Sequence, residues 1–247
     1  MFRRVVLFFG EWQDPIEGDL PSTKHFIPSM NFNAFTTFLN PNGYAKHIRL
    51  LELYQSEMYR GLFGTPVISR EASMEVISSL VCILEHLVQI KCLDLTRTRW
   101  AILPTSIKAA IIKAADQNPN LVVQLSVSNL SPTDLVPLFS ECKSLKLMES
   151  KNNEQSPLIE RLPIWKNYPP KLTRLEFDST FPGVDTLVEC CPKMFSILRH
   201  FSSRGNLRGL KAAWALAQVA YHTLQRLELE VDTNCFDEVQ SDHILSC

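Results

Sequence analysis

The chain has 247 residues, of which 45% are hydrophobic and 21% are charged, and its formal net charge is −1. These proportions are ordinary for a globular protein and exclude a low-complexity or disordered chain. The net charge gives no global attraction to nucleic acid or to an anionic membrane.

No stretch approaches the ~18 apolar residues that are needed to span a bilayer. The apolar run Val5–Phe9 follows two arginines, but it is too short for the core of a signal peptide and no small-residue cleavage site follows it. We therefore expect an intracellular protein, cytoplasmic or nuclear, with neither a membrane nor a nucleic acid as its partner.

Eight short segments follow or approach the strand pattern L-x-x-L-x-L, whose last two apolar residues point to one side because strand side chains alternate. These segments begin at Phe2, Ile48, Ile90, Val122, Cys142, Leu172, Phe195 and Leu224. From Ile90 onward their spacing clusters around the ~20–29-residue period of leucine-rich repeats. The longer spacing before Ile90 indicates irregular repeats with insertions in residues 1–66.

Segments with helical spacing separate the strand patterns. The first is Asn31–Leu39, which follows a connection without clear periodicity over residues 11–29 and ends at the turn Pro41-Asn42-Gly43. Further helices are predicted over Ser69–Leu87, Pro104–Asn118, Ser131–Cys142, Val184–Cys191 and Gly209–His222. Residues 151–168 are predicted to form a surface loop, and residues 232–247 an acidic, frayed tail.

A single strand and helix of this size cannot bury both apolar faces alone, so neighbouring units must stack. We therefore predict one α/β, leucine-rich-repeat-like solenoid over residues 1–231, with a curved, mostly parallel sheet and helices on its convex side. The standard repeat places Asn or Cys three residues after the last strand leucine. Here that position holds Ser56, Thr98, Leu130, Ser150, Thr180 and Asp232, so the repeats are degenerate.

Residues that alternate with the inward-pointing leucines should line the concave face, where repeat proteins commonly bind their partners. The candidate protein-binding residues are Glu52, Asp94, Gln124, Ser126, Arg174, Glu176, Arg226 and Glu228. Arg174 and Glu176 should occupy the same places on their strand as Arg226 and Glu228 on theirs. The alternative is that these side chains only solvate the sheet.

The segment from Cys190 to Leu227 contains no acidic residue but six lysines and arginines. Such a basic stretch could bind an acidic or phosphorylated partner. The alternative is a solvated face that the acidic tail balances.

No catalytic, metal or cofactor signature stands out. The motifs G-x-S-x-G, H-E-x-x-H and G-x-G-x-x-G and the P-loop are absent. Cys82, His86 and Cys92 suggest a metal cluster, but a structural zinc needs four ligands and no fourth lies nearby in the sequence. The seven cysteines are irregularly spaced, which does not match a disulfide framework. We therefore predict a non-enzymatic protein with reduced thiols and no cofactor.

The run Leu84-x-x-Leu87-x-x-Ile90-x-x-Leu93-x-Leu95, with Trp100 and Leu103-Pro104 after it, resembles the fungal F-box/leucine-rich-repeat-like proteins. Pro169-Pro170-Lys171-Leu172 continues the resemblance, which covers about residues 1–231. It implies a substrate-recognition subunit of a cullin-type ubiquitin ligase, whose F-box helices hold the adaptor.

The first residues match the strand that follows the F-box in such proteins, so the F-box itself is expected to be missing. The expected partner is an unknown protein, and a cullin adaptor only if an F-box is restored upstream. The alternatives are a scaffold or binding module unconnected with ubiquitination, and a truncated gene product without ligase function.

Overall fold

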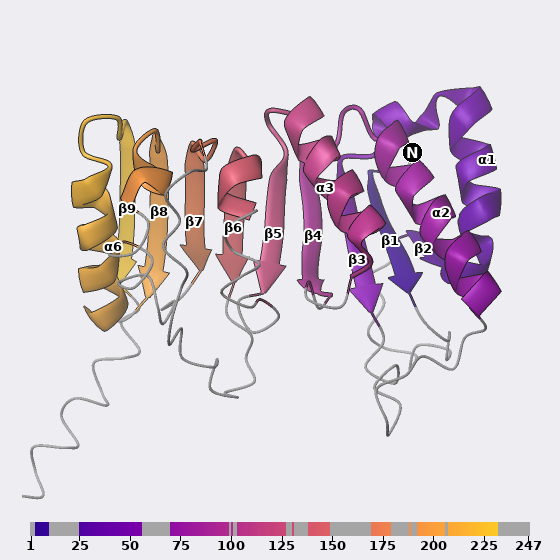
Figure 1. Ribbon diagram of the computed structural model, residues 1–247, viewed down its shortest axis with the longest axis horizontal. Helices are drawn as coiled ribbons and strands as arrows, with labels where there is room; N and C mark the ends of the chain where they lie inside the picture. Colours follow the sequence, from indigo (N-terminus) through magenta and orange to yellow (C-terminus); the bar gives the residue numbers. More distant parts are fainter. Residues whose placement is uncertain are drawn as a thin grey trace, which may run out of the picture.

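The computed structural model describes residues 3–9, 25–55, 70–98, 100, 103–126, 130, 138–148, 169–178, 188, 192–205 and 207–231. Within these residues, nine strands form a single sheet in the order β2-β1-β3-β4-β5-β6-β7-β8-β9 (Figure 1). Every pair of neighbouring strands is parallel. The predicted α/β architecture with a mostly parallel sheet is thus confirmed at this level.

The strands are short and similar in length. Their bounds are β1 (Arg4–Phe9), β2 (His25–Pro28), β3 (Leu50–Gln55), β4 (Cys92–Arg97), β5 (Val122–Ser126), β6 (Ser144–Met148), β7 (Arg174–Asp178), β8 (His200–Gly205) and β9 (Arg226–Val231). The helices are α1 (Phe32–Asn42), α2 (Arg70–His86), α3 (Thr105–Gln117) and α6 (Leu207–Val219). Single 3-10 turns cover Ser29–Asn31, Tyr44–His47 and Pro192–Phe195.

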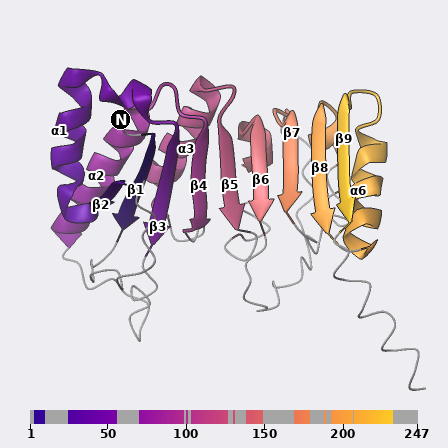
Figure 2. The same cartoon turned by 180° about the vertical axis from the view of Figure 1, so that it is seen from behind.

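The helices lie on one side of the sheet. α2 and α3 stand in front of the strands in Figure 1 and behind them in Figure 2, where the opposite face of the sheet is turned to the viewer. α1 flanks the β2 end and α6 the β9 end of the same layer. Because strands and helices share one continuous apolar core, each unit buries its apolar faces against its neighbours.

Alternation along each strand builds that core. In the strand register, Leu51 lies beside Leu93, which lies beside Val123, and all three are fully buried. Two residues further along the strands, neighbouring positions are apolar again. For example, Leu125 of β5 lies beside Leu147 of β6. The helices contribute the opposite layer with residues at 3 and 4 spacing, such as those of α3: Ile107, Ala110, Ile111, Ala114 and Ala115.

The predicted helices 69–87, 104–118 and 209–222 correspond to α2, α3 and α6, with boundaries that differ by one to three residues. The predicted helix 31–39 corresponds to α1, which runs on to Asn42 and ends at Gly43 in the left-handed region (φ 60°). Within the predicted helix 131–142 only residues 138–141 are described as helical. Residues 151–168 and 232–247 lie outside the described residues.

The connection predicted over residues 11–29 is wrong at its end, because His25–Pro28 forms strand β2. This strand pairs with the outer side of β1, while β3 pairs with the inner side. The chain therefore places its second strand at the edge before it reverses direction along the sheet. Only four residues long and closed by Pro28, β2 lacks the alternating pattern that would have indicated it.

Two strand patterns needed a shift. The pattern Val122-x-x-Leu125-x-Val127 predicted Leu125 and Val127 as the inward-pointing pair. The buried pair of β5 is instead Val123 and Leu125. The strand predicted to begin at Phe195 begins at His200, because Pro192–Phe195 forms a 3-10 turn.

With this correction, Leu175, Phe201 and Leu227 share one position on β7, β8 and β9, and successive members are 26 residues apart. The last repeats are thus more regular than the predicted spacing.

Side-chain hydrogen bonds join consecutive repeats at their turns. Thr98, at the position where the standard repeat has Asn or Cys, is buried, and its Oγ1 donates to the Leu53 carbonyl across 2.7 Å. Asn118 is also buried, and its Nδ2 donates to the carbonyls of Ala114 (2.9 Å) and Leu87 (3.3 Å). Leu130 occupies the turn position as a buried apolar residue. The degenerate position therefore keeps its bonding role at Thr98 and loses it at Leu130.

The apolar layer thins at β9. Leu227 and Leu229 are 37% and 38% exposed, whereas the residues beside them on β8, Phe201 and Ser203, are 1% and 4% exposed. Within the described residues no helix follows β9 to cover them.

Candidate functional site

The face of the sheet turned away from the helices is the candidate site. Strand side chains that point there fall into three rows, because the strands are parallel and in register. The first row holds Arg4, Leu50, Cys92, Val122, Ser144, Arg174, His200 and Arg226. The middle row holds Val6, Glu52, Asp94, Gln124, Lys146, Glu176, Ser202 and Glu228. The last row includes Phe8, Tyr54, Arg97, Ser126, Met148 and Arg204.

All eight predicted binding residues lie on this face. Five of them share the middle row, which are Glu52, Asp94, Gln124, Glu176 and Glu228. Arg174 and Arg226 belong to the first row, and Ser126 to the last. The structure therefore brings the predicted set to one face that spans β3 to β9, where Ser126 is only 4% exposed and adds little accessible surface.

Arg174 and Glu176 form the same ion pair on β7 as Arg226 and Glu228 form on β9. The Arg174 Nε donates to Glu176 Oε1 across 2.7 Å, and the Arg226 Nε to Glu228 Oε1 across 2.8 Å. The predicted correspondence of the two pairs is confirmed, since β8 lies between them in register. Each pair lies within one strand and is exposed. Exposed ion pairs add only about 0.2–1 kcal/mol to the stability of the fold, and both charges stay accessible to a ligand.

Asp94 is held by its own strand. Its Oδ1 accepts from the Thr96 backbone N–H (2.9 Å) and from Thr96 Oγ1 (2.7 Å). The register between β3 and β4 shifts here, so that Tyr54 pairs with Arg97. The Asp94 carboxylate thus stabilises a bulge in β4, a structural role that the alternating pattern could not reveal.

Arg4, Lys146 and a cluster of Tyr54, Phe8 and Arg97 also lie on this face but are not among the predicted binding residues. Arg4 forms an ion pair with Glu52, whose side chain is only 14% exposed. Tyr54 stacks on Phe8 with ring centroids 5.1 Å apart, and the Arg97 guanidinium lies 5.2 Å from the Tyr54 centroid. Arg4 stands two residues after Phe2, as Arg174 stands two residues after Leu172, so the strand pattern itself could have identified it.

Cys92 lies in the first row, and its surroundings do not activate its thiol. Burial, with a smaller contribution from the Asp94 carboxylate, raises the pKa of its thiol to about 11. Its Sγ lies 3.8 Å from Gln124 Oε1, and the Gln124 amide in turn contacts the Met148 sulfur. A thiol that is protonated at neutral pH is not an activated nucleophile.

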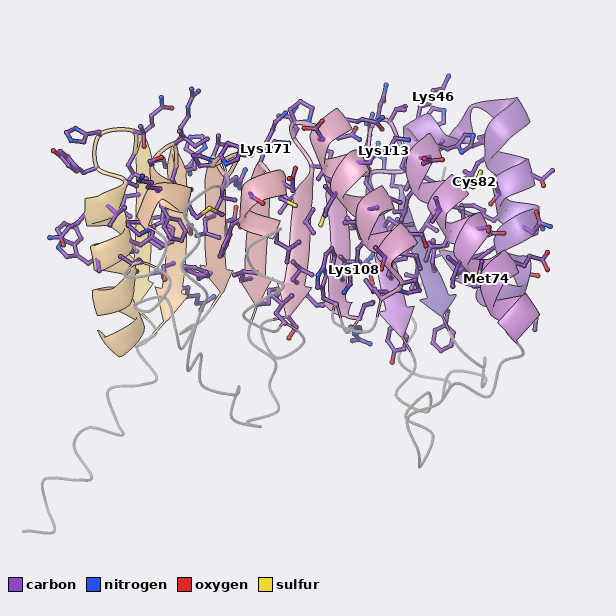
Figure 3. All side chains as sticks on the ribbon, in the orientation of Figure 1. Lys46, Met74, Cys82, Lys108, Lys113 and Lys171 are labelled. Atoms are coloured by element: carbon purple, nitrogen blue, oxygen red, sulfur yellow. The ribbon has the colours of Figure 1, made fainter. Side chains whose placement is uncertain are left out.

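The suggested metal cluster does not assemble. His86 Nδ1 lies 2.6 Å from the Cys82 carbonyl and 3.6 Å from Cys82 Sγ on α2, on the helix side of the sheet (Cys82 is labelled in Figure 3). Cys92 belongs to the uncovered face. Across the described ranges, no three His, Cys, Asp or Glu side chains are grouped so that they could hold a metal ion.

Among the described helices, none is long and apolar enough to cross a membrane.

The basic stretch 190–227 is divided between different surroundings. Arg204 lies 3.8 Å from Glu230 and Arg226 is paired with Glu228, whereas Arg199 is exposed.

Trp100, which stands between β4 and α3, is 2% exposed and has the Lys108 Nζ 5.7 Å from its ring centroid. Trp100 is therefore part of the apolar core beside α3.

A comparison with known proteins finds no matching family model, no matching curated protein and no matching solved structure.

Proposed function

We propose that this chain is a non-catalytic protein-recognition module that binds its partner across the uncovered face of the sheet. The observation that carries the proposal is the alignment of three rows of mostly polar and charged side chains over eight parallel strands, with no described helix above them. At about 4.8 Å per strand and 3.3 Å per residue, the face from β1 to β9 measures roughly 34 Å by 17 Å. Including the relief of the side chains, this is comparable with the about 800 Å² that one partner buries in a standard interface.

The character of the face supports a protein ligand. The first row carries three arginines and no acid, whereas the middle row carries four acids and one lysine. Such a charge pattern favours a partner with complementary charges and gives specificity and association rate more than raw affinity. The Tyr54–Phe8 stack with Arg97 supplies residue types that are enriched at the energetic centres of interfaces. By resemblance to F-box/leucine-rich-repeat-like proteins, the module would be the substrate arm of a cullin-type ubiquitin ligase, with the adaptor held by F-box helices elsewhere.

A charge exchange tests the face without removing its ion pairs. The variant R174E/E176R/R226E/E228R inverts both pairs and preserves their bonding. The matched control K113E/E85K inverts the Lys113–Glu85 pair (2.7 Å) that joins α3 to α2 on the other side. Affinity purification from the native cells with quantitative mass spectrometry should recover partners with the wild type and the control that are lost with the face variant.

Identical partner sets for the wild type and the face variant would refute recognition through this face. The ligase connection is tested separately with the full gene product, including any coding sequence upstream of Met1. Co-purification of a cullin and its adaptor would support it. If partners depend on the face but no cullin adaptor co-purifies, the recognition proposal stands and the ligase role is overturned.

A further inference from the structure

A second surface runs along the edge of the sheet where the strands begin. Backbone hydrogen bonds link one residue of each repeat to the next, for example from Lys91 N to the Arg49 carbonyl (2.8 Å) and from Arg199 N to the Thr173 carbonyl (2.9 Å). This edge row consists of Arg3, Arg49, Lys91, Leu121, Lys143, Thr173, Arg199 and Gln225, in which the strand register, and not such a bond, places Leu121. Five of its eight members are basic and none is acidic.

Four of the five cations are available to a ligand. Arg3, Lys91 and Arg199 are exposed and Lys143 is partly exposed. Within the described part of the chain, none of these four side chains has a hydrogen bond or an ion pair. Arg49 differs, because its Nη1 donates to the Gln89 carbonyl across 2.8 Å. This bond gives Arg49 an internal role at the turn that follows α2, and the other four cations have no such bond.

The acidic side chains at the carbonyl ends of the helices are already neutralised. Glu85 of α2 pairs with Lys113 of α3 at 2.7 Å. Lys171 pairs with Glu141 at 3.0 Å and with Asp116 of α3 at 3.6 Å. Figure 3 shows Lys113 and Lys171 along this upper edge. The positive charge of the edge row therefore remains uncompensated by these acids.

The four cations are evenly distributed. They immediately precede β1, β4, β6 and β8, and one strand separates each of these strands from the next in the sheet order. At about 4.8 Å per strand they recur every ~9.6 Å over a total of about 29 Å. A polyproline II helix has three residues per turn and rises about 3.1 Å per residue, so every third side chain projects from the same side at ~9.3 Å intervals. Carboxylates at every third residue of such a segment match the edge row.

We propose that the edge row binds an acidic polypeptide segment in the polyproline II conformation, with Asp or Glu at every third position. The surface is separate from the uncovered face, so the inference goes beyond the proposed function. A nucleic acid fits less well. The row contains no aromatic residue for base stacking.

The test uses a labelled decapeptide, EPPEPPEPPE, and fluorescence anisotropy with the whole chain at low ionic strength, where charge interactions are least screened. The variant R3Q/K91Q/K143Q/R199Q removes the four free cations. The variant R97Q/R174Q/R204Q/R226Q removes four cations of the uncovered face and changes the net charge equally. Circular dichroism and urea unfolding check that both variants fold. A third variant, R3K/K91R/K143R/R199K, keeps the charges and should bind like the wild type.

The edge variant should raise the Kd of the decapeptide at least tenfold, and the face variant less than twofold. The block peptide EEEEPPPPPP, with the same composition, should bind several-fold more weakly than EPPEPPEPPE. Equal losses in the two charge-removal variants would reduce the effect to net charge and overturn the proposal, as would the absence of binding. Equal affinity for the two peptides would overturn the spacing. Tighter binding of single-stranded DNA, lost in the edge variant alone, would assign the row to nucleic acid instead.

Discussion

Leu175 and Leu227 have the same residue type and the same position in their strands, yet they should differ sharply when shortened to alanine. Leu175 is fully buried between Leu145 on β6 and Phe201 on β8. Leu175→Ala removes its transfer free energy and leaves a cavity, which together cost about 2–5 kcal/mol. Leu227 is 37% exposed on the edge strand. Fully burying a leucine contributes about 1.5–3 kcal/mol, and solvent fills the space at the edge, so Leu227→Ala should cost less than about 1.5 kcal/mol.

Equilibrium unfolding in urea measures both losses, provided that the slope of the free energy against urea is the same in wild type and variants. The two variants are each other's control, because the chemical change is identical. A difference of at least about 1.5 kcal/mol between them would support the thinning of the apolar layer at β9. Losses that agree within about 0.5 kcal/mol would refute it, since they would show that Leu227 is as well covered in solution as Leu175.

Three further results are expected. Thr98→Val leaves the Leu53 carbonyl without its donor and should cost about 1–3 kcal/mol in urea unfolding, whereas Thr98→Ser keeps the hydroxyl and should cost less; equal costs would contradict the hydrogen bond. The hydrogen bond from Lys113 lowers the pKa of Glu85 below 4.5, so the stabilisation by this pair is present above that value and is lost as the pH falls through the lowered pKa. In Lys113→Gln the Glu85 pKa, followed by carboxyl ¹³C NMR, should return toward 4.5, and an unchanged pKa would argue against the pair. Burial raises the pKa of Cys142 to about 12, so its alkylation by iodoacetamide at pH 8, read by peptide mass spectrometry, should be no faster than unfolding. Rapid labelling of the native protein would contradict its burial.

Much of the architecture follows from local pattern. Where Leu93 and Leu95 alternate with polar residues, and where α3 presents apolar residues at helical spacing, the buried faces are where the pattern indicates. Parallel pairing follows as well, because a helix between two strands returns the chain to the same edge of the sheet. The leucine-rich-repeat type itself remains a prediction.

The errors have physical causes. β2 is a four-residue edge strand ended by a proline, so it carries too few alternating residues to be distinguished from a loop. At Phe195 the anchor was placed three residues early, because Phe195 is itself buried in a 3-10 turn and imitates the first apolar residue of the pattern. The true anchor, Leu198, is fully buried immediately before β8.

The candidate face was predictable as a set of positions, but its internal contacts were not. Period-two alternation is sufficient to place Glu176 and Glu228 on one face. It does not reveal that Asp94 bonds to Thr96 at a bulge, because bulges change the register by one residue and leave no composition signal. The edge row also escaped the pattern, since its members precede the strands and become neighbours only through the register.

The two ends of the sheet differ in a way that bears on how such a chain can evolve. β2 closes one end with four residues and Pro28, which has no N–H to offer to a further strand. β9 presents six residues, Arg226–Val231, none of them proline, and leaves Leu227 and Leu229 partly uncovered. Duplication of a strand–helix unit should therefore extend the array more readily beyond β9 than beyond β2. Among proteins descended from this one, gains and losses of whole repeats should accumulate on the β9 side, with the β2 end kept constant.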